Sequence, residues 1–498
     1  MTDSASVPAN RMSRRLVLLL VATGGATALL SACGGNVGGN VTAPATTAGS
    51  STAAGGAATR AVVASSAGSV ATTQVQAPLT TASRVASAPA TTVTGAQRPL
   101  VVQQWDAPTS PFGKWLLTYL QAFPKQSGIQ LDIRQHTGDA AQEQSVWVAS
   151  GDVPDVFFRT GRGAIPYAAF VDKKVIQPLD AYVKKDNFDL SDFWPRVIEL
   201  MTSQGHLWVM PQDFNQELFG YNPAFLQTAG VKAPPSDWTD QSWTWSAFLQ
   251  AAQQTQHYLT TQSGAGHYAY GRPDSSWQLW VWTNGGDLLD ANWQQVALDQ
   301  PAALEALDFA AKLAQTEHVA PRPADKLPAG TTLGSLAVAM DALWAAGFNN
   351  LRGGTKSMDF DTALFPRGAG EYAAYGGGGG YVMSATSKQP EAAWTLLKYI
   401  GAPEYAQQKV TAGALGPRIS TAKQYFVQAG IPPAHAAVYF DAPAHAHWEP
   451  NLTNWPDIAT AIDKALLPLW QGQQNAKDAV AGGKAAIEAL IKQGSALH

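Results

Sequence analysis

The composition of the first 98 residues confines any packed domain to the remainder of the 498-residue chain. From Gly34 to about Arg98 the sequence is almost entirely Ala, Thr, Ser, Gly and Val, with no aromatic and no acidic residue. Such a segment cannot bury enough apolar surface to offset the entropy lost on ordering. We therefore expect a disordered tether over residues 34–98, with an r.m.s. span of about 45 Å, and a folded body that begins near Pro99.

The residues before the tether have the pattern of a secretory signal peptide. A polar stretch that ends in Arg14-Arg15 precedes the apolar run Leu16–Leu30, whose 15 residues are short for a membrane span of about 20. The following Leu30-Ser31-Ala32-Cys33 resembles the lipobox of bacterial lipoproteins, in which the cysteine is lipidated and becomes the mature N-terminus. The resemblance predicts a signal peptide over residues 1–33, lipidation of Cys33 and an extracytoplasmic protein anchored to the bacterial cell membrane.

The export route remains open at this stage. Ser13-Arg14-Arg15-Leu16 resembles a twin-arginine export signal, which is an address read by a receptor and not an anchor. An ordinary basic region before the apolar run would have the same appearance. The sequence therefore predicts export without deciding between the general secretory and the twin-arginine routes.

Charge and cysteine content exclude several classes of protein. Six of the 33 basic residues and one of the 37 acidic residues precede Pro99, which leaves 27 against 36 in the body, a net charge of −9. An acidic body is a poor nucleic-acid binder, because phosphate neutralisation needs a basic surface. The single cysteine excludes a disulfide framework and a cysteine-based zinc site. His445-Ala-His447-Trp-Glu449 has metal-like residue types but fits an exposed loop better, so we expect no metal and no cofactor.

From Pro99 onward, strand and helix patterns alternate. Leu100–Gln103 and Ile129–Ile133 are predicted strands, and between them Trp115 to Phe123 show the apolar spacing of a helix. Strands separated by helices predict a mainly parallel sheet covered on both faces. Further elements are predicted at about 140–150 (helix), 155–158 (strand), 243–248, 301–317, 391–400 and 458–469 (helices).

Several segments of the body, in order, resemble those of one known family. They are Gly151–Phe158, Val175–Asp180, Trp208–Pro211, Phe219–Phe225, Ala337–Trp344, Phe365–Gly368, Gly376–Gly380, Glu391–Lys398 and Leu469–Gly472. Over about residues 150–490 the chain resembles family 1 extracellular solute-binding proteins, the sugar-capturing receptors of ABC importers. Residues 99–150 match only in their pattern of strands and helices.

The resemblance implies an α/β, two-lobed periplasmic-binding-protein type II-like fold with a ligand cleft between the lobes. The chain would cross between the lobes more than once. The expected first lobe comprises residues 99–212 and 364–412, and the expected second lobe comprises residues 213–363 and 413–498. The crossings are predicted near Met210–Gln216, Ala363–Arg367 and Ala412–Arg418.

A sugar-binding site needs flat aromatic surfaces and a few fixed polar groups, because a sugar has an apolar C–H face and a rim of hydroxyls. Ligands of open α/β sheets bind beyond the carboxyl ends of the strands. The resemblance therefore places Trp105, Asp106 and Arg159 in ligand-facing loops. It also places Asp213 or Asn215 toward the ligand at the first crossing. The alternatives are a core-rim role for Trp105, solvated surface for Asp106 and Arg159, and turn formation for Asp213 and Asn215.

Tryptophan is as frequent as phenylalanine, 17 of each, and supplies the other candidate contacts. Trp277 and Trp280 would share one helix face, and Trp344 matches a family position at which an aromatic ring commonly stacks on sugar. Trp448 and Trp455 flank the start of the late helix. Core packing is the alternative for these tryptophans. The glycines around Gly378 would let the backbone approach the ligand or permit lobe rotation, unless they form a simple loop.

The sequence as a whole predicts a monomeric, lipid-anchored binding protein that closes on a carbohydrate and delivers it to an ABC permease. The excess of tryptophan favours a di- or oligosaccharide, although a polyol, a monosaccharide, a sugar phosphate or a non-sugar solute remains open. A surface-anchored glycan hydrolase is the alternative from another class, since aromatic clefts serve both and 37 acidic residues could include a catalytic pair. No catalytic motif is recognisable, so no catalytic residue is predicted.

Overall fold

The computed structural model describes residues 98–136, 146–161, 163, 166–263, 266–325, 333–335, 337–353, 359–411 and 414–497. The predictions on the signal peptide, Cys33 and the tether lie outside these residues. Residues from Pro99 to the C-terminus belong to one compact unit. Within the described part of this unit, no helix combines the length and the apolar character that a membrane crossing requires.

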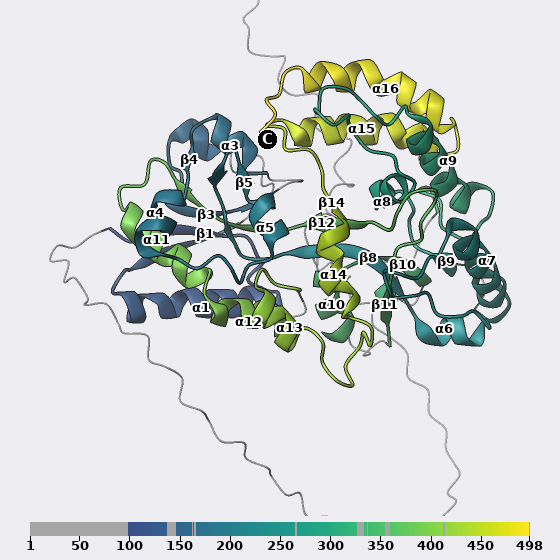
Figure 1. The fold of residues 1–498 in the computed structure, drawn as a ribbon, viewed down its shortest axis with the longest axis horizontal. Helices are drawn as coiled ribbons and strands as arrows, with labels where there is room; N and C mark the ends of the chain where they lie inside the picture. The colour runs from purple at the N-terminus through teal and green to yellow at the C-terminus, as the bar shows by residue number, and fades with distance from the viewer. Residues whose placement is uncertain are drawn as a thin grey trace, which may run out of the picture. The chain divides into compact units, whose positions relative to one another are not determined.

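The first of two main sheets, at the left of Figure 1, has the strand order β2-β1-β3-β13-β4, with β7 also paired to β13. Strand β1 runs parallel to β2 and β3, whereas β13 runs antiparallel to β3, β4 and β7. The strands are β1 (Leu100–Gln104), β2 (Leu131–Gln135), β3 (Val156–Thr160), β4 (Ile176–Gln177), β7 (Met210–Pro211) and β13 (Gly379–Ser384). The helices of this lobe are α1 (Pro111–Ser127), α3 (Ala168–Asp172), α4 (Asp180–Asp186), α5 (Pro195–Leu200), α11 (Pro390–Ile400), α12 (Pro403–Thr411) and α13 (Ile419–Tyr425), and β5 (Thr202–Ser203) pairs with β6 (His206–Leu207).

The second sheet has the order β14-β12-β8-β10-β9, and β11 shares one edge of β8 with β12. Its strands are β8 (Asn215–Tyr221), β9 (Tyr268–Tyr270), β10 (Val338–Trp344), β11 (Asp361–Ala363), β12 (Ala374–Gly377) and β14 (Ala446–His447). Its helices are α6 (Pro223–Thr228), α7 (Trp245–Gln262), α8 (Trp277–Thr283), α9 (Pro301–Gln315), α10 (Phe348–Gly353), α14 (Val438–Asp441), α15 (Trp455–Trp470) and α16 (Ala476–Ile491), with short 3₁₀ turns at Leu333–Ser335, Ala345–Gly347 and Ala442–His445.

Both sheets are mixed, so the expectation of a mainly parallel sheet is wrong for the second lobe. The central strand β8 is antiparallel to β10, β11 and β12. The first sheet keeps its parallel core of β1, β2 and β3, but β13 enters it from the second lobe and runs the opposite way. Strand direction thus follows from the crossings between lobes, which local periodicity does not reveal.

Two neighbouring segments connect the sheets. Strand β7 of the first sheet continues through Gln212–Phe214 into β8 of the second, and β12 of the second continues through Gly378 into β13 of the first. The backbone N–H groups of Gln212 and Asp213 both donate to the carbonyl oxygen of Gly379, at 2.8 and 3.0 Å. The two crossing segments are therefore tied to each other by hydrogen bonds.

The structure places only the first crossing where it was predicted. The second lies at Gly378 and not at Ala363–Arg367, because that segment turns inside the second lobe: the N–H of Arg367 donates to the carbonyl of Trp243 at 3.1 Å. Residues 364–377 therefore remain with the second sheet.

The return to the second lobe also comes later than the predicted Ala412–Arg418. The side chain of Arg418, at the start of α13, still donates to the carbonyl of Gly401 at 2.7 Å, within the first lobe. Phe426, just after α13, packs against Phe348 and Tyr439 of the second lobe. The chain thus crosses at about Phe426.

Local signals in the sequence explain most helix boundaries. The Ser110 hydroxyl accepts from the N–H of Gly113 and caps α1. Thr244 caps α7 in the same way, so Trp243 lies outside this helix, contrary to prediction. Helix α15 buries the predicted stripe of Ile458, Ile462, Leu466 and Leu469 and packs against α16.

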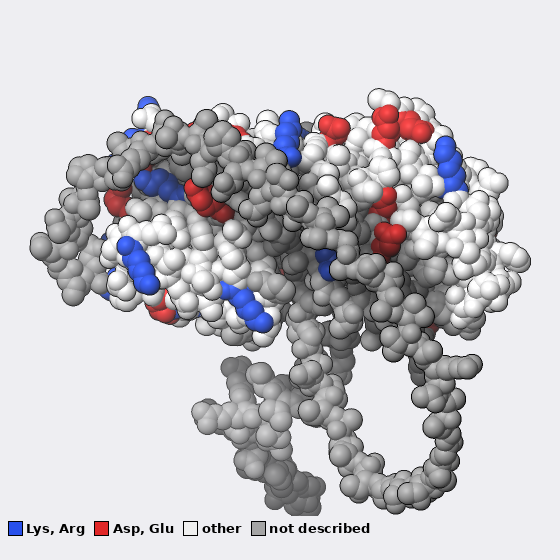
Figure 2. All heavy atoms as spheres, turned by 90° about the horizontal axis from the view of Figure 1, so that it is seen from below, with Lys and Arg blue, Asp and Glu red and all other residues white. Residues whose placement is uncertain are grey.

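The surface carries few charges, in keeping with a composition of only 14% charged residues. On the face shown in Figure 2, lysines and arginines are scattered singly among uncharged side chains. The part of that face that the described residues form and that is open to view therefore shows no basic patch of the kind that binds a phosphate backbone.

At each position of the glycine run 376–380, other atoms lie close to where a Cβ would be. A Cβ on Gly377 would lie 3.2 Å from the Trp344 ring, and one on Gly378 would lie 2.8 Å from the carbonyl oxygen of Asp213. At Gly380 a Cβ would overlap the carbonyl oxygen of Met210. The run is therefore required by packing around the crossings.

We predict that Gly380→Ala lowers the free energy of unfolding by about 2–4 kcal/mol, because the new methyl group meets a backbone atom that cannot move alone. Urea unfolding of the purified body measures the change. Gly482→Ala is the matched control, since Gly482 lies in α16 with no atom near its missing Cβ. This variant should raise the free energy of unfolding by up to about 1 kcal/mol. Equal stability of the two variants would contradict the packing argument.

Candidate functional site

One row of side chains crosses the second sheet close to the crossings. Strand register places Trp344 of β10 opposite Glu217 of β8, Glu217 opposite Tyr375 of β12, and Tyr375 opposite His447 of β14. Residues directly opposite each other point to the same face of a sheet, as do residues two apart on one strand. Asn215, at the start of β8, therefore lies on this face too, next to the first crossing.

The rings of this row pack closely. The ring centroids of Trp344 and Tyr375 are 5.1 Å apart, and Trp282 of α8 lies 5.1 Å from Tyr375 and 5.4 Å from His447. Trp344 and Tyr375 remain partly exposed, whereas Trp282 is buried. The row therefore presents two accessible aromatic surfaces beside Asn215.

Glu217 is a carboxyl group buried between those two rings. Its side chain belongs to a residue that is only 4% exposed, and its Oε1 accepts a hydrogen bond from the Ser276 hydroxyl at 2.9 Å. Burial raises the pKa of Glu217 to about 8; the Ser276 hydrogen bond opposes this rise and the nearby Asp341 carboxyl adds to it. Glu217 is therefore mostly a neutral acid at pH 7.

Two further acids lie beside this row. Burial raises the pKa of Glu449, and interactions with Tyr375 and Trp455 oppose the rise. Burial likewise raises the pKa of Asp463 on α15, with Trp277 opposing it, and Asp463 acts electrostatically on Glu449. Each of these residues interacts with, or is next in sequence to, another of them, and together we call them the acid–aromatic cluster. Its members are Glu217, Ser276, Trp277, Tyr375, Glu449, Trp455 and Asp463.

The first lobe reaches this cluster through the loop after β3. A Cβ on Gly163 would lie 3.3 Å from Oε2 of Glu449. Two residues beyond Glu449, the Asn451 amide donates to the Tyr167 hydroxyl of the first lobe at 3.4 Å. The cluster thus lies where the two lobes meet.

A second polar group lies in the first lobe beside the crossings. Asp213 Oδ1 accepts from the N–H of Gly379 at 2.6 Å, and Oδ2 is 3.5 Å from Nζ of Lys409 on α12. Burial raises the pKa of Asp213 and the Lys409 ammonium opposes the rise. The hydroxyls of Tyr381 and Tyr405 are buried and find no hydrogen-bond partner among the described residues. Buried hydroxyls of this kind are available to a ligand or to water.

The structure brings several predicted residues to these two groups. Trp277 and Trp455 belong to the acid–aromatic cluster, and Asn215 and Trp344 lie beside it on the same face of the sheet. Asp213 belongs to the first-lobe group. Asp106 interacts electrostatically with Asp213, Tyr381 and Tyr405 and so lies near that group. Gly378 lies in the crossing itself, where its close neighbour is the backbone of Asp213 and Phe214.

Two predicted residues are in the core. Arg159 is 1% exposed, with its guanidinium 4.2 Å and 4.5 Å from the ring centroids of Phe170 and Phe157, because alternation along β3 turns it toward α3. Trp280 is fully buried and packs against Phe365 at 4.7 Å. The expectation that they face a ligand is contradicted by these positions.

Trp448 and Trp105 lie elsewhere. Trp448 covers Gly376. Gly376 pairs with Gln216, so this ring lies on the face of the second sheet opposite to that of Asn215. The guanidinium of Arg196 stacks on the Trp448 ring at 4.3 Å. Trp105 is partly exposed at the end of β1 and stacks on His136 at 4.3 Å.

Sequence reasoning missed the carboxyl groups of the cluster. Glu217 gave a usable signal, since a charged residue directly before the apolar run Leu218–Tyr221, in the same strand, is unusual for a buried strand. Glu449 had been noted only as part of the metal-like string His445–Glu449, and Asp463 gave no signal, because each acquires its surroundings from segments distant in the chain.

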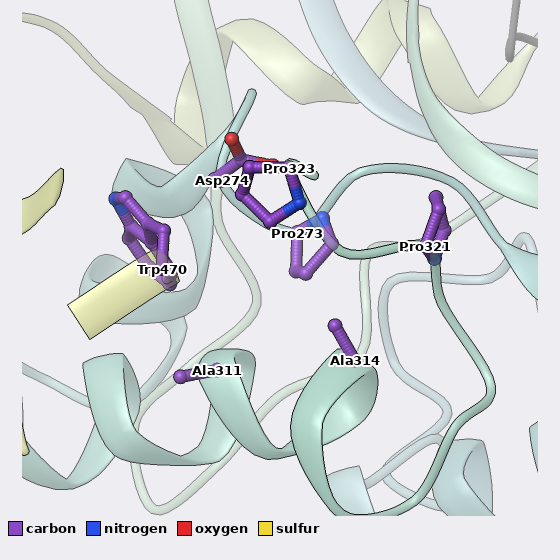
Figure 3. Close-up of a pocket in the computed structure, with 7 residues that line it drawn as sticks. All are labelled: Pro273, Asp274, Ala311, Ala314, Pro321, Pro323 and Trp470. Atoms are coloured by element: carbon purple, nitrogen blue, oxygen red, sulfur yellow. The ribbon is translucent and has the colours of Figure 1, made fainter. Parts of the chain in front are cut away.

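Two other places are candidates for a ligand site, a hollow in the second lobe and the histidines near His445. The hollow drawn in Figure 3 lies between the residues named below. Its volume is about 180 Å³ with the solvent opening included, which is smaller than the roughly 300 Å³ of a typical ligand site. Among the described residues no group of three His, Cys, Asp or Glu side chains is placed to hold a metal ion. His445 instead stacks on Trp238 at 4.0 Å. The hollow is lined by Pro273, Asp274, Ala311, Ala314, Pro321, Pro323 and Trp470.

Comparison with known families assigns the chain to one of them. Residues 106–407 match the model of the bacterial extracellular solute-binding proteins. The chain belongs to this family. This is a family of solute-binding proteins and not of enzymes, which argues against the glycan-hydrolase alternative.

Individual relatives are distant but similar over most of their length. A binding protein of Brucella abortus (strain 2308) is 21% identical over 412 residues, which cover 79% of this chain and 93% of the relative. The ABC substrate-binding protein Lmo0181 from Listeria monocytogenes, solved with cycloalternan, has a TM-score of 0.69 at 20% identity and covers 79% of this chain and 99% of its own. UgpB from Mycobacterium tuberculosis, solved with glycerophosphocholine, has a TM-score of 0.67 at 19% identity, with coverages of 80% and 99%. At these identities the likeness establishes the two-lobed binding-protein fold.

We predict that Glu217→Gln removes part of the pH dependence of stability. Below about pH 4.5 the Glu217 carboxyl is protonated in both the folded and the unfolded protein, whereas between about pH 4.5 and pH 8 only the folded protein keeps the proton. The wild type therefore loses stability as the pH rises through this window, and the glutamine variant avoids the loss that Glu217 causes.

The free energy of unfolding of Glu217→Gln, relative to that of the wild type, should rise by about 2–4 kcal/mol between about pH 5 and about pH 9. Urea unfolding at both pH values measures it. Glu371→Gln, at an exposed position, is the control and should follow the wild type. A Glu217→Gln curve parallel to that of the wild type would show that the carboxyl ionises normally.

Proposed function

We propose that this protein is the lipid-anchored receptor of an ABC importer and captures a di- or oligosaccharide between its two lobes for delivery to a permease. The observation that carries the proposal is the acid–aromatic cluster at the meeting of the lobes, beside the partly exposed rings of Trp344 and Tyr375. Flat rings suit the C–H face of a sugar, and carboxyl and amide groups suit its hydroxyls.

The first-lobe group supports the same function. Asp213 and Lys409 supply an acceptor and a donor. The hydroxyls of Tyr381 and Tyr405, which have no hydrogen-bond partner among the residues that the structure describes, supply two more positions for hydrogen bonds. A sugar between the lobes would satisfy groups from both sides. Contacts that exist only when the lobes are together would favour the closed form on binding.

The structural neighbours were solved with ligands of two classes. The Listeria neighbour was solved with a carbohydrate and the Mycobacterium neighbour with a polar phosphodiester. The two carboxylates Asp106 and Asp213, against the single ammonium of Lys409, favour an uncharged polyhydroxyl ligand over a phosphate in this chain.

The anchor is a separate part of the proposal and rests on Leu30-Ser31-Ala32-Cys33. Lipidation of the Cys33 thiol should place the protein in the membrane fraction of a bacterial host and incorporate labelled palmitate. Cys33→Ser should be unlabelled. Labelling that persists in Cys33→Ser would contradict the assignment of this residue.

Thermal unfolding of residues 99–498 against a panel of mono- and oligosaccharides tests the ligand. A sugar at 100 times its dissociation constant should raise the free energy of unfolding by about 2.7 kcal/mol, and the sugar should be recovered intact. Trp344→Leu should weaken its binding about tenfold through the lost stacking surface, whereas Trp293→Leu, outside both polar groups, should not. A panel without any stabilising sugar would overturn the carbohydrate proposal and leave the family assignment standing.

A further inference from the structure

One short segment of the second lobe carries several contacts with the first lobe. It comprises residues 446–451, and we call it the contact segment. A Cβ on Gly163 of the first lobe would lie 3.3 Å from Oε2 of Glu449. The Asn451 amide donates to the Tyr167 hydroxyl of the first lobe at 3.4 Å. These contacts between the lobes are thus concentrated on one stretch of chain.

The contact segment is also part of the candidate site. Its strand β14 pairs with β12, which places His447 opposite Tyr375 at one end of the row of rings. Glu449 belongs to the acid–aromatic cluster. A shift of the first lobe relative to the contact segment would therefore change the site as well.

The side chain of Arg196 reaches the contact segment from α5 of the first lobe. Its Nη2 donates to the carbonyl oxygen of Ala446 at 3.0 Å, and its guanidinium carbon lies 4.3 Å from the centroid of the Trp448 ring. One planar guanidinium can donate from its edge while it stacks with its face, which a lysine ammonium cannot do. Figure 1 likewise shows α5 close to β14, although the two are far apart in the sequence.

Arg196 is oriented by its own lobe. Its Nη1 donates to Oε1 of Glu199 at 2.6 Å, within the same helix. Helix α5 is itself fixed to the first sheet, because Leu200 is fully buried and a Cβ on Gly161, directly after β3, would overlap it. The guanidinium therefore moves with the first lobe.

The two partners of Arg196 are fixed to the second lobe. Ala446 pairs with Ala374 of β12, and a Cβ on Gly376 of the same strand would lie 2.6 Å from the Trp448 ring. A rotation of the lobes about their crossing segments would therefore move the guanidinium relative to both partners.

We propose that Arg196 is a positioning residue for ligand capture, because its bridge from α5 to the contact segment stabilises the arrangement in which the lobes meet. This inference rests on the proposed function of the site between the lobes. It adds a residue whose bridge, to Ala446 and Trp448, is made outside the two polar groups of that site. The bridge acts on the lobes and not on the chemistry of the ligand, so its loss should weaken the binding of different ligands by a similar factor.

A distance between the lobes can be measured without any ligand on the protein from residue 99 onward. Cys33 is the only cysteine of the chain, so Asp172→Cys and Lys492→Cys can be spin-labelled specifically. Both positions are exposed; Asp172 ends α3 of the first lobe, and Lys492 follows α16 of the second.

These labels flank the contact segment. Asn451 donates to the hydroxyl of Tyr167, directly before α3, and to the carbonyl of Leu497, beyond α16. Separation of the lobes at the contact segment would therefore lengthen the distance between the labels. In pulsed electron paramagnetic resonance, Arg196→Ala should raise the ratio of longer to shorter distances at least about fivefold, because a hydrogen bond and a cation–π contact are lost.

Sugar binding is the second measurement, made with the sugar that stabilises the protein most in the thermal panel. Arg196→Ala should raise its dissociation constant at least about fivefold, mainly through faster dissociation. Arg196→Lys should lie between this variant and the wild type, since it keeps the charge and loses the planar face.

The matched control is Arg322→Ala. Arg322 forms an ion pair with Asp325, three residues later, as Arg196 does with Glu199, but it lies within the second lobe. This variant should leave both the label distances and the sugar affinity unchanged. Arg196→Ala should also keep the urea midpoint of the wild type, because a partly exposed side chain that joins two lobes contributes little to the stability of either.

Unchanged label distances together with an unchanged sugar dissociation constant in Arg196→Ala would overturn the inference. Tighter sugar binding by this variant would overturn it as well, since the bridge would then oppose closure. If no sugar of the panel binds, the carbohydrate proposal fails and the label distances alone decide on Arg196. If a sugar binds and Arg196→Ala changes neither measurement, only the inference on Arg196 fails.

Discussion

The hydrogen bonds between the two crossing segments are the constraint on which the rest of this structure depends. Both N–H groups at Gln212 and Asp213 donate to one carbonyl, that of Gly379, and the N–H of Gly379 donates back to the Asp213 carboxylate. The direction of β13 in the first sheet and of β8 in the second follows from this pairing. So does the position of Asn215, which is brought to the junction of the lobes because β8 begins there.

The second organising feature is the placement of acids in the second lobe. Removing a carboxyl group from water is costly, and burial keeps Glu217 a neutral acid although the hydrogen bond donated by the Ser276 hydroxyl favours the charged form. An apolar side chain at this position would contribute more to the free energy of unfolding than the buried carboxyl group does. Retention of an acid here is intelligible if the group contacts a ligand, because a buried carboxyl group discriminates strongly between ligands that can and cannot form a hydrogen bond with it.

The sequence predicted the fold better than it predicted the site. Capping residues such as Ser110, the apolar stripe of α15 and the order of family-like segments were sufficient for the two-lobed architecture. The second and third crossings were misplaced because a turn within a lobe and a turn between lobes have the same local composition. Arg159 was misassigned because strand alternation determines its direction, and the polar end of a strand does not show which face is covered by α3. Glu449 and Asp463 could not be found, since the contacts that bury them join segments that the sequence keeps apart.

The glycine run at residues 376–380 has a consequence for how this chain can vary. Its five positions face five different neighbours: Trp448, Trp344, the backbone of Asp213, Phe158 and the backbone of Met210. A methyl group at any one of them requires a different compensating change elsewhere, and two of the neighbours are main-chain atoms that no substitution can shrink. In a library of random variants these five codons would therefore remain nearly fixed among folded proteins.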